Sequence, residues 1–284
     1  MPSALPLNDT TRGPARLPAW LRYLAGAAAL LACVYALAIA ALWWGQERLL
    51  FAPSRLPADF RYDTPPDVQE TWVDVPGARL NALHLRLPHP DGVVFYLHGN
   101  GGDLSSWFVN SDYYRKLNFD LYMLDYRGYG KSSGHIESQA QLQADVRAAW
   151  DSIAAQYGGK RRVIVGRSLG TGLAAALASE VQPELTVLIS PYFSMVDLAR
   201  THYPWVPTAV LRYPLHTDVW LPRIRGRVLL THGERDALIP YEHSLRLQAL
   251  LPRATLLAVP DAAHNDIHKF PVYLDGLAAA LKAP

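Results

Sequence analysis

The sequence predicts an α/β domain with a mostly parallel sheet of about eight strands and helices on both faces, preceded by one transmembrane helix. After a long uncharged segment near the N-terminus, short runs of apolar residues alternate with stretches in which apolar residues recur at helical spacing. Strands that are apolar on both sides and alternate with helices are typical of a parallel sheet. The 284-residue chain is long enough for one such domain with a well-buried core.

The first element is an uncharged segment over residues 24–44, which reads LAGAAALLACVYALAIAALWW. At about 1.5 Å per residue, a helix of this length crosses the ~30 Å hydrocarbon core of a bilayer. Trp20 and Tyr23 at one end, with Trp43 and Trp44 at the other, are typical of interfacial aromatic belts. We therefore expect a disordered tail over residues 1–19 and a transmembrane anchor over residues 20–45.

The charges that flank this segment predict its orientation. Three arginines precede it against one aspartate, whereas Glu47 and Arg48 cancel just after it. The positive-inside rule then places the N-terminus in the cytoplasm and the rest of the chain outside, in the periplasm if the source is bacterial. A cleaved signal peptide, with a site such as Ala36-Leu37-Ala38, and a lipoprotein signal ending at Cys33 are the alternatives. The apolar run continues past both sites, which favours an uncleaved anchor.

A proline-punctuated linker over residues 46–66 leads into a domain over residues 67–284. Alternating apolar and polar residues around Pro76-Gly77 predict an antiparallel hairpin. Six buried strands should follow, at residues 93–97, 121–124, 163–165, 187–189, 228–230 and 256–259.

An aromatic-rich segment, residues 192–223, interrupts the alternation between two of these strands. An insertion at this point would overhang the strand ends, so we expect a small cap over an apolar substrate pocket. Surface packing is the alternative. The aromatic side chains expected to face the pocket are Tyr192, Phe193, Tyr203 and Trp205.

Composition excludes several classes of function. The net charge of +2 and the absence of a basic stripe after the anchor argue against a nucleic-acid partner. Cys33, the only cysteine, lies inside the apolar segment, which excludes intrachain disulfides, cysteine-ligated zinc and a cysteine nucleophile. Gly128–Ser132 lacks the first glycine of a phosphate-binding loop, and His264–His268 lacks the glutamate of a zinc-protease motif. We expect no cofactor and no metal, and the sequence does not indicate an oligomeric state.

The most informative motif is Gly166-Arg167-Ser168-Leu169-Gly170, because of what flanks it. Apolar, β-branched residues precede it, and the small, helix-prone run Thr171–Ala178 follows. On a strand–turn–helix, Gly-x-Ser-x-Gly predicts a nucleophile elbow, in which a tight turn presents a strained serine. Small residues two positions before and after Ser168 let strand and helix approach closely. An ordinary turn that happens to contain serine is the alternative.

Acyl transfer also needs a base and a group that orients it, and both residue types occur after downstream strands. Asp236 lies on the loop that follows strand 228–230, and His264 lies just beyond strand 256–259. Each residue alone is ambiguous. The order Ser, Asp, His at successive strand ends predicts a catalytic triad of Ser168, Asp236 and His264.

The developing oxyanion needs backbone donors, and a glycine-rich loop supplies one. Strand 93–97 leads into His98-Gly99-Asn100-Gly101-Gly102. We expect the N–H groups of Asn100 and Leu169 to form the oxyanion hole, with a plain tight turn as the alternative. His98 and His232 precede glycines at strand ends and are expected to be structural hydrogen-bonding residues.

Five motifs in this order resemble the α/β-hydrolase superfamily, over roughly residues 47–275. They are His98–Gly102, Asp125–Ser132, Gly166–Gly170, His232-Gly233-x-x-Asp236 and His264-Asn265-Asp266. The chain looks most like the α/β-hydrolase-domain-containing proteins of the bud-emergence type, which are single-pass, membrane-anchored serine hydrolases. The resemblance implies the α/β-hydrolase fold, the triad and oxyanion donors given above, and hydrolysis of carboxylic esters or thioesters of lipid-like or acylated substrates. Thr171-Gly172 departs slightly from the small-residue pair that often follows the elbow.

The sequence therefore predicts a membrane-anchored serine hydrolase that acts on small-molecule esters or thioesters through an acyl-enzyme. A serine aminopeptidase or amidase on the same fold is one alternative, because a fold does not determine its reaction. A non-catalytic, membrane-tethered scaffold is the other.

Overall fold

The computed structural model describes residues 18–283 and divides the chain into two compact units, residues 1–44 and 45–284. The predicted N-terminal tail lies outside the described residues except for its last two positions. Helix α1, Ala19–Leu50, continues past the predicted end of the anchor at residue 45, and its last turn belongs to the second unit. By length and composition α1 can span a membrane, a property that signal sequences share.

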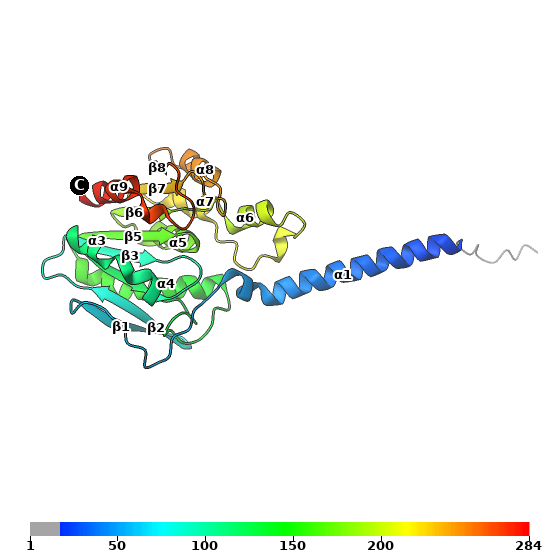
Figure 1. Cartoon of the computed structure of the whole chain (residues 1–284), viewed down its shortest axis with the longest axis horizontal. Helices are drawn as coiled ribbons and strands as arrows, with labels where there is room; N and C mark the ends of the chain where they lie inside the picture. The colour runs from blue at the N-terminus through cyan, green and yellow to red at the C-terminus, as the bar shows by residue number, and fades with distance from the viewer. Residues whose placement is uncertain (1–17, 284) are drawn as a thin grey trace, which may run out of the picture. The chain divides into compact units, whose positions relative to one another are not determined.

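The second unit is built on one eight-stranded sheet with the order β1-β2-β4-β3-β5-β6-β7-β8 (Figure 1). The pairs β1–β2 and β2–β4 are antiparallel, and all the others are parallel. Figure 1 shows β1 and β2 at one edge of the sheet and β7 and β8 at the other. The strands are β1 Val68–Val75, β2 Ala78–Leu85, β3 Gly92–Leu97, β4 Phe119–Leu124, β5 Arg161–Arg167, β6 Leu185–Ile189, β7 Arg227–Gly233 and β8 Thr255–Val259.

Helices cover both faces of the sheet. Side chains of α4, α5, α7 and α8 border the core on one face, and those of α2, α3 and α9 border the core on the other. The helices are α2 Leu104–Trp107, α3 Ser111–Lys116, α4 Gln139–Ala154, α5 Leu169–Val181, α6 Met195–His202, α7 Thr217–Trp220, α8 Glu242–Leu250 and α9 Pro271–Lys282. Short 3-10 turns are η1 Phe108–Asn110, η2 Ala155–Tyr157, η3 Thr208–Val210, η4 Leu221–Arg223 and η5 Ile267–Lys269.

The central strands are apolar because they are buried on both sides. In β3, Phe95 and Leu97 belong to the core under α4 and α5, whereas Val94 and Tyr96 belong to the core under α3 and α9. This alternation follows from the two-residue period of a strand. The predicted fold class is confirmed: the hairpin turns at Gly77, whose φ is +75°, and each of the six predicted runs lies within a parallel-sheet strand.

The last turn of α1 is fixed to the aromatic-rich segment. Gln46 donates to the Val210 carbonyl at 3.0 Å and accepts from the Arg212 N–H at 2.7 Å. Glu47 accepts from the Tyr213 hydroxyl at 2.8 Å and pairs with Arg212 at 2.6 Å. These contacts attach the start of the predicted linker to the segment that was expected to form a cap.

The next part of the linker pairs with two loops at the strand ends. The Ser54 N–H donates to the Gly102 carbonyl at 3.1 Å, and the Ser54 carbonyl accepts from the Gly130 N–H at 2.7 Å. Isolated bridges join Pro53 to Gly102 and Arg55 to Gly130. Residues 52–55 of the linker therefore form an ordered segment, here called the strap, across the loop that is predicted to form the oxyanion hole.

Candidate active site

The turn between β5 and α5 has the geometry of a nucleophile elbow. Ser168 has φ +51° and ψ −119°, a backbone region that L-residues rarely adopt. A Cβ on Gly166 would lie 2.6 Å from the Cβ of Ala174, and one on Gly170 would collide with the Leu97 carbonyl. Both positions need glycine because strand and helix lie too close for any side chain. The result is a serine held at the start of a helix.

Three residues that are distant in sequence meet at this elbow. Ser168 Oγ lies 2.9 Å from His264 Nε2, and His264 Nδ1 lies 2.7 Å from Asp236 Oδ2. Ser168 follows β5, His264 follows β8 and Asp236 follows β7. These strands are parallel, so their carboxyl ends lie on the same side of the sheet. His264 can therefore accept the serine proton at Nε2 while it donates its Nδ1–H to the carboxylate.

Asp236 is held in its ionised form. Burial alone raises the pKa of this carboxyl, but hydrogen bonds from His232, His264 and the Ile239 N–H outweigh burial, so the pKa lies well below its usual range. His232 Nε2 lies 2.8 Å from the Ile239 carbonyl and 3.3 Å from Asp236 Oδ2, and its Nδ1 lies 2.7 Å from Ser244 Oγ. The carbonyl contact requires a hydrogen on Nε2. His232 is thus a fully buried structural partner of the acid loop.

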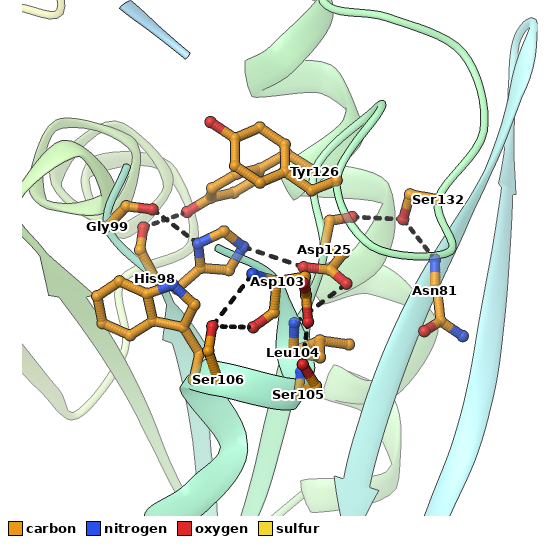
Figure 2. Close-up of polar contacts among 12 residues, drawn as sticks. Asn81, His98, Gly99, Asp103, Leu104, Ser105, Ser106, Asp125, Tyr126 and Ser132 are labelled. Carbon is orange, nitrogen blue, oxygen red and sulfur yellow. Dashed lines mark hydrogen bonds and ion pairs between the residues drawn. The ribbon is translucent and has the colours of Figure 1, made fainter. Parts of the chain in front are cut away.

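A second buried histidine supports the glycine-rich loop after β3 (Figure 2). His98 Nδ1 lies 2.7 Å from the Gly99 carbonyl, and the Tyr126 hydroxyl donates to the His98 carbonyl at 2.8 Å. His98 Nε2 faces Asp125 Oδ1 at 3.5 Å, with both side chains fully buried. Burial raises the pKa of Asp125, and His98 partly offsets this. Because the Gly99 carbonyl and the Asn100 N–H share one peptide, this bond also fixes the direction of that N–H.

The predicted oxyanion donors occupy well-defined positions. Leu169 is the first residue of α5, where backbone N–H groups have no partner within the helix. Asn100 uses its side chain to hold its own loop: Oδ1 accepts from the N–H groups of Ala52 and Gly101, at 2.8 and 2.9 Å, and from the Tyr129 hydroxyl at 3.1 Å. The bond to Ala52 connects the strap to the loop, a contact that the sequence does not indicate.

The four predicted pocket residues have different surroundings. Tyr192 is fully buried, and its hydroxyl donates to the Leu169 carbonyl at 2.9 Å, so it stabilises the first turn of α5. Phe193 is half-buried and lies under the Arg246 guanidinium. Tyr203 and Trp205 are more than half exposed, at 57% and 55%. The cavity beside the site is lined by none of the four and lies on the other face of the sheet.

The described residues do not form a set of metal ligands. Within residues 18–283 no three His, Cys, Asp or Glu side chains are grouped to hold an ion. His268, which the sequence places near the base at helical spacing, lines the cavity instead.

Comparisons with known proteins agree with this architecture. Residues 88–221 match the family model described as "Serine aminopeptidase, S33". The chain is 31% identical over 257 residues to an uncharacterized protein of Mycobacterium tuberculosis (strain ATCC 25618 / H37Rv), covering 87% of this chain and 89% of that protein. It is 30% identical over 213 residues to alpha/beta hydrolase domain-containing protein 17C of Xenopus tropicalis, covering 72% of this chain and 67% of that protein.

A solved structure shares the fold. An esterase of Pyrococcus furiosus matches with a TM-score of 0.66 at 19% identity, covering 82% of this chain and 97% of that one. Fold, sequence relatives and strand-end serine together define the class. The chain belongs to the α/β-hydrolase superfamily and is a hydrolase.

Proposed function

We propose that this hydrolase is a membrane-anchored serine esterase or thioesterase, with Ser168 as nucleophile, His264 as base and Asp236 as the group that orients the base. The observation that carries the proposal is the unbroken chain of contacts from Ser168 Oγ to His264 Nε2, at 2.9 Å, and from His264 Nδ1 to Asp236 Oδ2, at 2.7 Å. It begins on a serine whose strained backbone exposes its hydroxyl at a helix N-terminus.

The acylation step follows from this geometry. Ser168 Oγ attacks the acyl carbonyl carbon while its proton moves to His264 Nε2. The carbonyl oxygen becomes an oxyanion that the N–H groups of Asn100 and Leu169 stabilise. His264 then gives its proton to the departing alcohol or thiol as the carbon–heteroatom bond breaks. The ionised Asp236 stabilises the imidazolium throughout.

Deacylation repeats these steps with water as the nucleophile. His264 takes a proton from water as it attacks the Ser168 ester, the same N–H groups hold the second oxyanion, and the proton returns to Ser168 Oγ. The acid leaves and the free enzyme is restored. Besides the substrate and one water molecule, these steps use only groups of the chain itself.

Covalent labelling tests the nucleophile. The full-length protein in detergent should react with a fluorophosphonate probe and hydrolyse p-nitrophenyl esters, and Ser168→Ala should lose both properties while keeping its circular dichroism spectrum. Ser190→Ala is the matched control, because this buried serine also follows a strand and has φ +50°, yet its Oγ has no hydrogen-bond partner among the described residues. Labelling that persists in Ser168→Ala would remove the proposal.

Failure of the wild type to label at all, with the fold intact, would instead favour a non-catalytic scaffold. The esterase proposal would then be abandoned, because the contacts among Ser168, His264 and Asp236 do not support catalysis if the Ser168 hydroxyl is unreactive.

The anchor is part of the proposal. We place α1 across a membrane with the N-terminus in the cytoplasm and the hydrolase unit outside, supported by the uncharged length of α1 and the arginines that precede it. In a Cys33→Ala background, a membrane-impermeant maleimide should label His135→Cys but not Ser3→Cys in intact cells. The reverse labelling would invert the orientation, and release of the protein from washed membranes would indicate cleavage.

An aminopeptidase is the second candidate, because the matching family model carries that description. Such an enzyme needs a carboxylate to hold the substrate ammonium group. Among the described residues that line the cavity, none is Asp or Glu. A panel that compares p-nitrophenyl esters with aminoacyl p-nitroanilides should show ester turnover alone, and turnover of the anilides at comparable kcat/KM would favour the aminopeptidase.

A further inference from the structure

A cavity of about 540 Å³ lies beside the elbow, between the sheet and the helices on the α3 and α9 face. Its floor is formed by side chains of β3 and β4, and its walls by α2, η1, α3, η5 and α9. This volume falls within the range of small-molecule sites, about 300–1,000 Å³. Its location differs from the one predicted from the sequence, which was beneath residues 192–223.

The lining of this cavity suits an apolar chain. Leu121, Met123, Leu274 and Leu277 supply aliphatic surface, and four tyrosine side chains also border it. The Tyr113 hydroxyl donates to the Leu274 carbonyl at 2.5 Å, so it does not need a ligand as a partner. Transfer of hydrocarbon from water to such a lining is favourable for each methylene that is buried.

The remaining tyrosines are neutral at physiological pH, and burial extends this to higher pH. Burial raises the pKa of Tyr96, Tyr114 and Tyr273 above the usual value for a phenol. The cavity wall therefore carries no negative charge from these side chains. A cationic ligand has no carboxylate partner among the described residues that line the cavity.

Part of the cavity lining contacts the segments that carry the proposed catalytic residues. Arg167, next to the nucleophile, lines the cavity, and its guanidinium donates to the His264 carbonyl at 3.2 Å. The same guanidinium lies 5.2 Å from the ring centroid of Trp107, and the indole donates to the Gly101 carbonyl at 2.9 Å. Gly101 and Gly102 belong both to the lining and to the loop of the proposed oxyanion hole.

Trp107 joins the cavity to the nucleophile through one shared contact. A Cβ added to Gly99 would lie 3.1 Å from Trp107 Cη2 and 3.4 Å from Ser168 Cβ. The indole that walls the cavity and the carbon that bears the nucleophile thus face the same glycine. The Trp107 indole therefore borders both the cavity and the glycine next to Ser168.

Arg167 and His268 add nitrogen groups to a lining that also includes Ser106, Asn110 and the four tyrosines. Arg167 has no carboxylate partner among the described residues, and His268 Nδ1 is a buried atom without a hydrogen-bond partner there. Both can face the oxygen atoms at the ester end of an amphiphile, whereas the interior can face its chain. The lining therefore offers apolar surface for an acyl chain and nitrogen groups for ester oxygen atoms.

We propose that this cavity binds the acyl chain of the ester or thioester, which enters past Trp107 and Arg167 and extends between α3 and α9. The proposal rests on the function proposed above and adds the place and chemistry of substrate recognition. The aromatic-rich segment, two of whose four predicted pocket residues are mostly exposed, does not hold the chain.

A substrate series tests this directly. The full-length protein in detergent is assayed with p-nitrophenyl acetate, octanoate and palmitate. Leu274→Trp, which fills the cavity, should lower kcat/KM for palmitate by about tenfold or more and that for acetate by less than about twofold. Val272→Trp adds the same bulk to an exposed position of α9 that does not line the cavity, and it should leave the whole series unchanged.

Leu277→Ala enlarges the cavity and should shift the preference toward longer chains. Leu277→Ala also keeps the test valid if Leu274→Trp fails to fold. Reaction with a small fluorophosphonate shows whether Leu274→Trp is folded. An equal fall for all three esters, or no change in either variant, overturns the proposed site. A change of chain preference in Tyr203→Ala alone would return the site to the aromatic-rich segment.

A binding measurement separates this proposal from the proposed function. Full-length Ser168→Ala is irradiated with a palmitic acid that carries a terminal diazirine, and the crosslinked peptides are identified by mass spectrometry. Crosslinks to α3 or α9 support the site even if no ester is turned over. Crosslinks confined to residues 192–223, or none that excess palmitate displaces, overturn it.

Discussion

The proposed catalytic residues and the cavity beside them are assembled in different ways. Each proposed catalytic residue lies within a few positions of the end of a strand: Ser168 after β5, Asp236 after β7 and His264 after β8. The carboxyl ends of these three parallel strands lie on the same side of the sheet. The cavity is closed by helices that meet only in the folded protein: Tyr113 and Leu274, which join across it, lie 161 positions apart. Reactive groups therefore follow from local geometry, whereas room for the substrate depends on long-range packing.

The strongest test of the strand-end group is removal of the base. His264→Ala should lower kcat for p-nitrophenyl acetate on the order of 10⁴-fold, because Ser168 then has no proton acceptor. KM should change little, since the cavity is untouched. The exposed His135→Ala serves as the control in the same steady-state assay. A loss below about tenfold would contradict the role given to His264.

The elbow is expected to be the least tolerant backbone in the group. Gly170→Ala should destabilise the fold by about 3 kcal/mol or more, because its Cβ collides with the backbone carbonyl of Leu97. Chemical denaturation measures the effect. Gly158→Ala is the matched control, since its Cβ would meet only one atom, the Ala155 carbonyl oxygen, at 3.8 Å. Equal stability of the two variants would mean that strand and helix can separate at the elbow.

Acid should weaken the sheet edge before it alters the triad acid. Burial, with a smaller effect from Arg86, lowers the pKa of His84 to about 4. In the unfolded chain His84 binds a proton near pH 6.5, whereas in the folded chain it does so only near pH 4. The neutral His84 therefore contributes its full stabilisation above pH 6.5, and this contribution is lost as the pH falls toward 4. We expect a loss of about 2 kcal/mol between pH 7 and pH 5 from this group.

Equilibrium unfolding at both pH values measures that loss, and His84→Phe should remove this part of it. The depressed pKa of Asp236 has its effect at lower pH: the stability it contributes is present above its usual pKa and is lost as the pH falls through its folded value. An unchanged slope in His84→Phe would assign the acid sensitivity to another group.

The smallest expected effect links the strap to catalysis. Asn100→Ala removes the acceptor for Ala52, Gly101 and Tyr129, and should lower kcat about tenfold with KM nearly constant, because the oxyanion loop is less well held. Tyr129→Phe removes only one of the three bonds and should have a smaller effect. A change in KM alone would indicate that the loop contacts the substrate rather than the oxyanion.

Prediction succeeded where one residue pattern has one physical solution. The apolar runs of β3 to β7 could be predicted from the sequence because strands buried on both faces tolerate few polar residues. The run in β8 was also found, although this edge strand is only partly buried. The glycines around Ser168 predicted a close strand–helix approach, which the structure shows. The catalytic roles of the three residues remain predictions that the proposed experiments test.

Prediction failed where side-chain partners come from distant segments. An aromatic run signals burial or binding equally well, and Tyr192 turned out to be packed beneath α5 while Tyr203 remains exposed. The strap was read as a linker because prolines indicate a lack of regular structure. Its bonds to Gly102 and Gly130 use backbone groups, which carry no signature in the sequence.

The sequence by itself determined the fold class, the elbow and the order of the three residues that meet there, since strand periodicity and glycine sterics act over a few residues. Only the tertiary structure decided where the apolar cavity lies, how the last turn of α1 and the strap attach to the aromatic-rich segment and the loops, and which partners His98 and His232 contact. Those features depend on the distances between helices and loops, and such distances are set when the whole core packs.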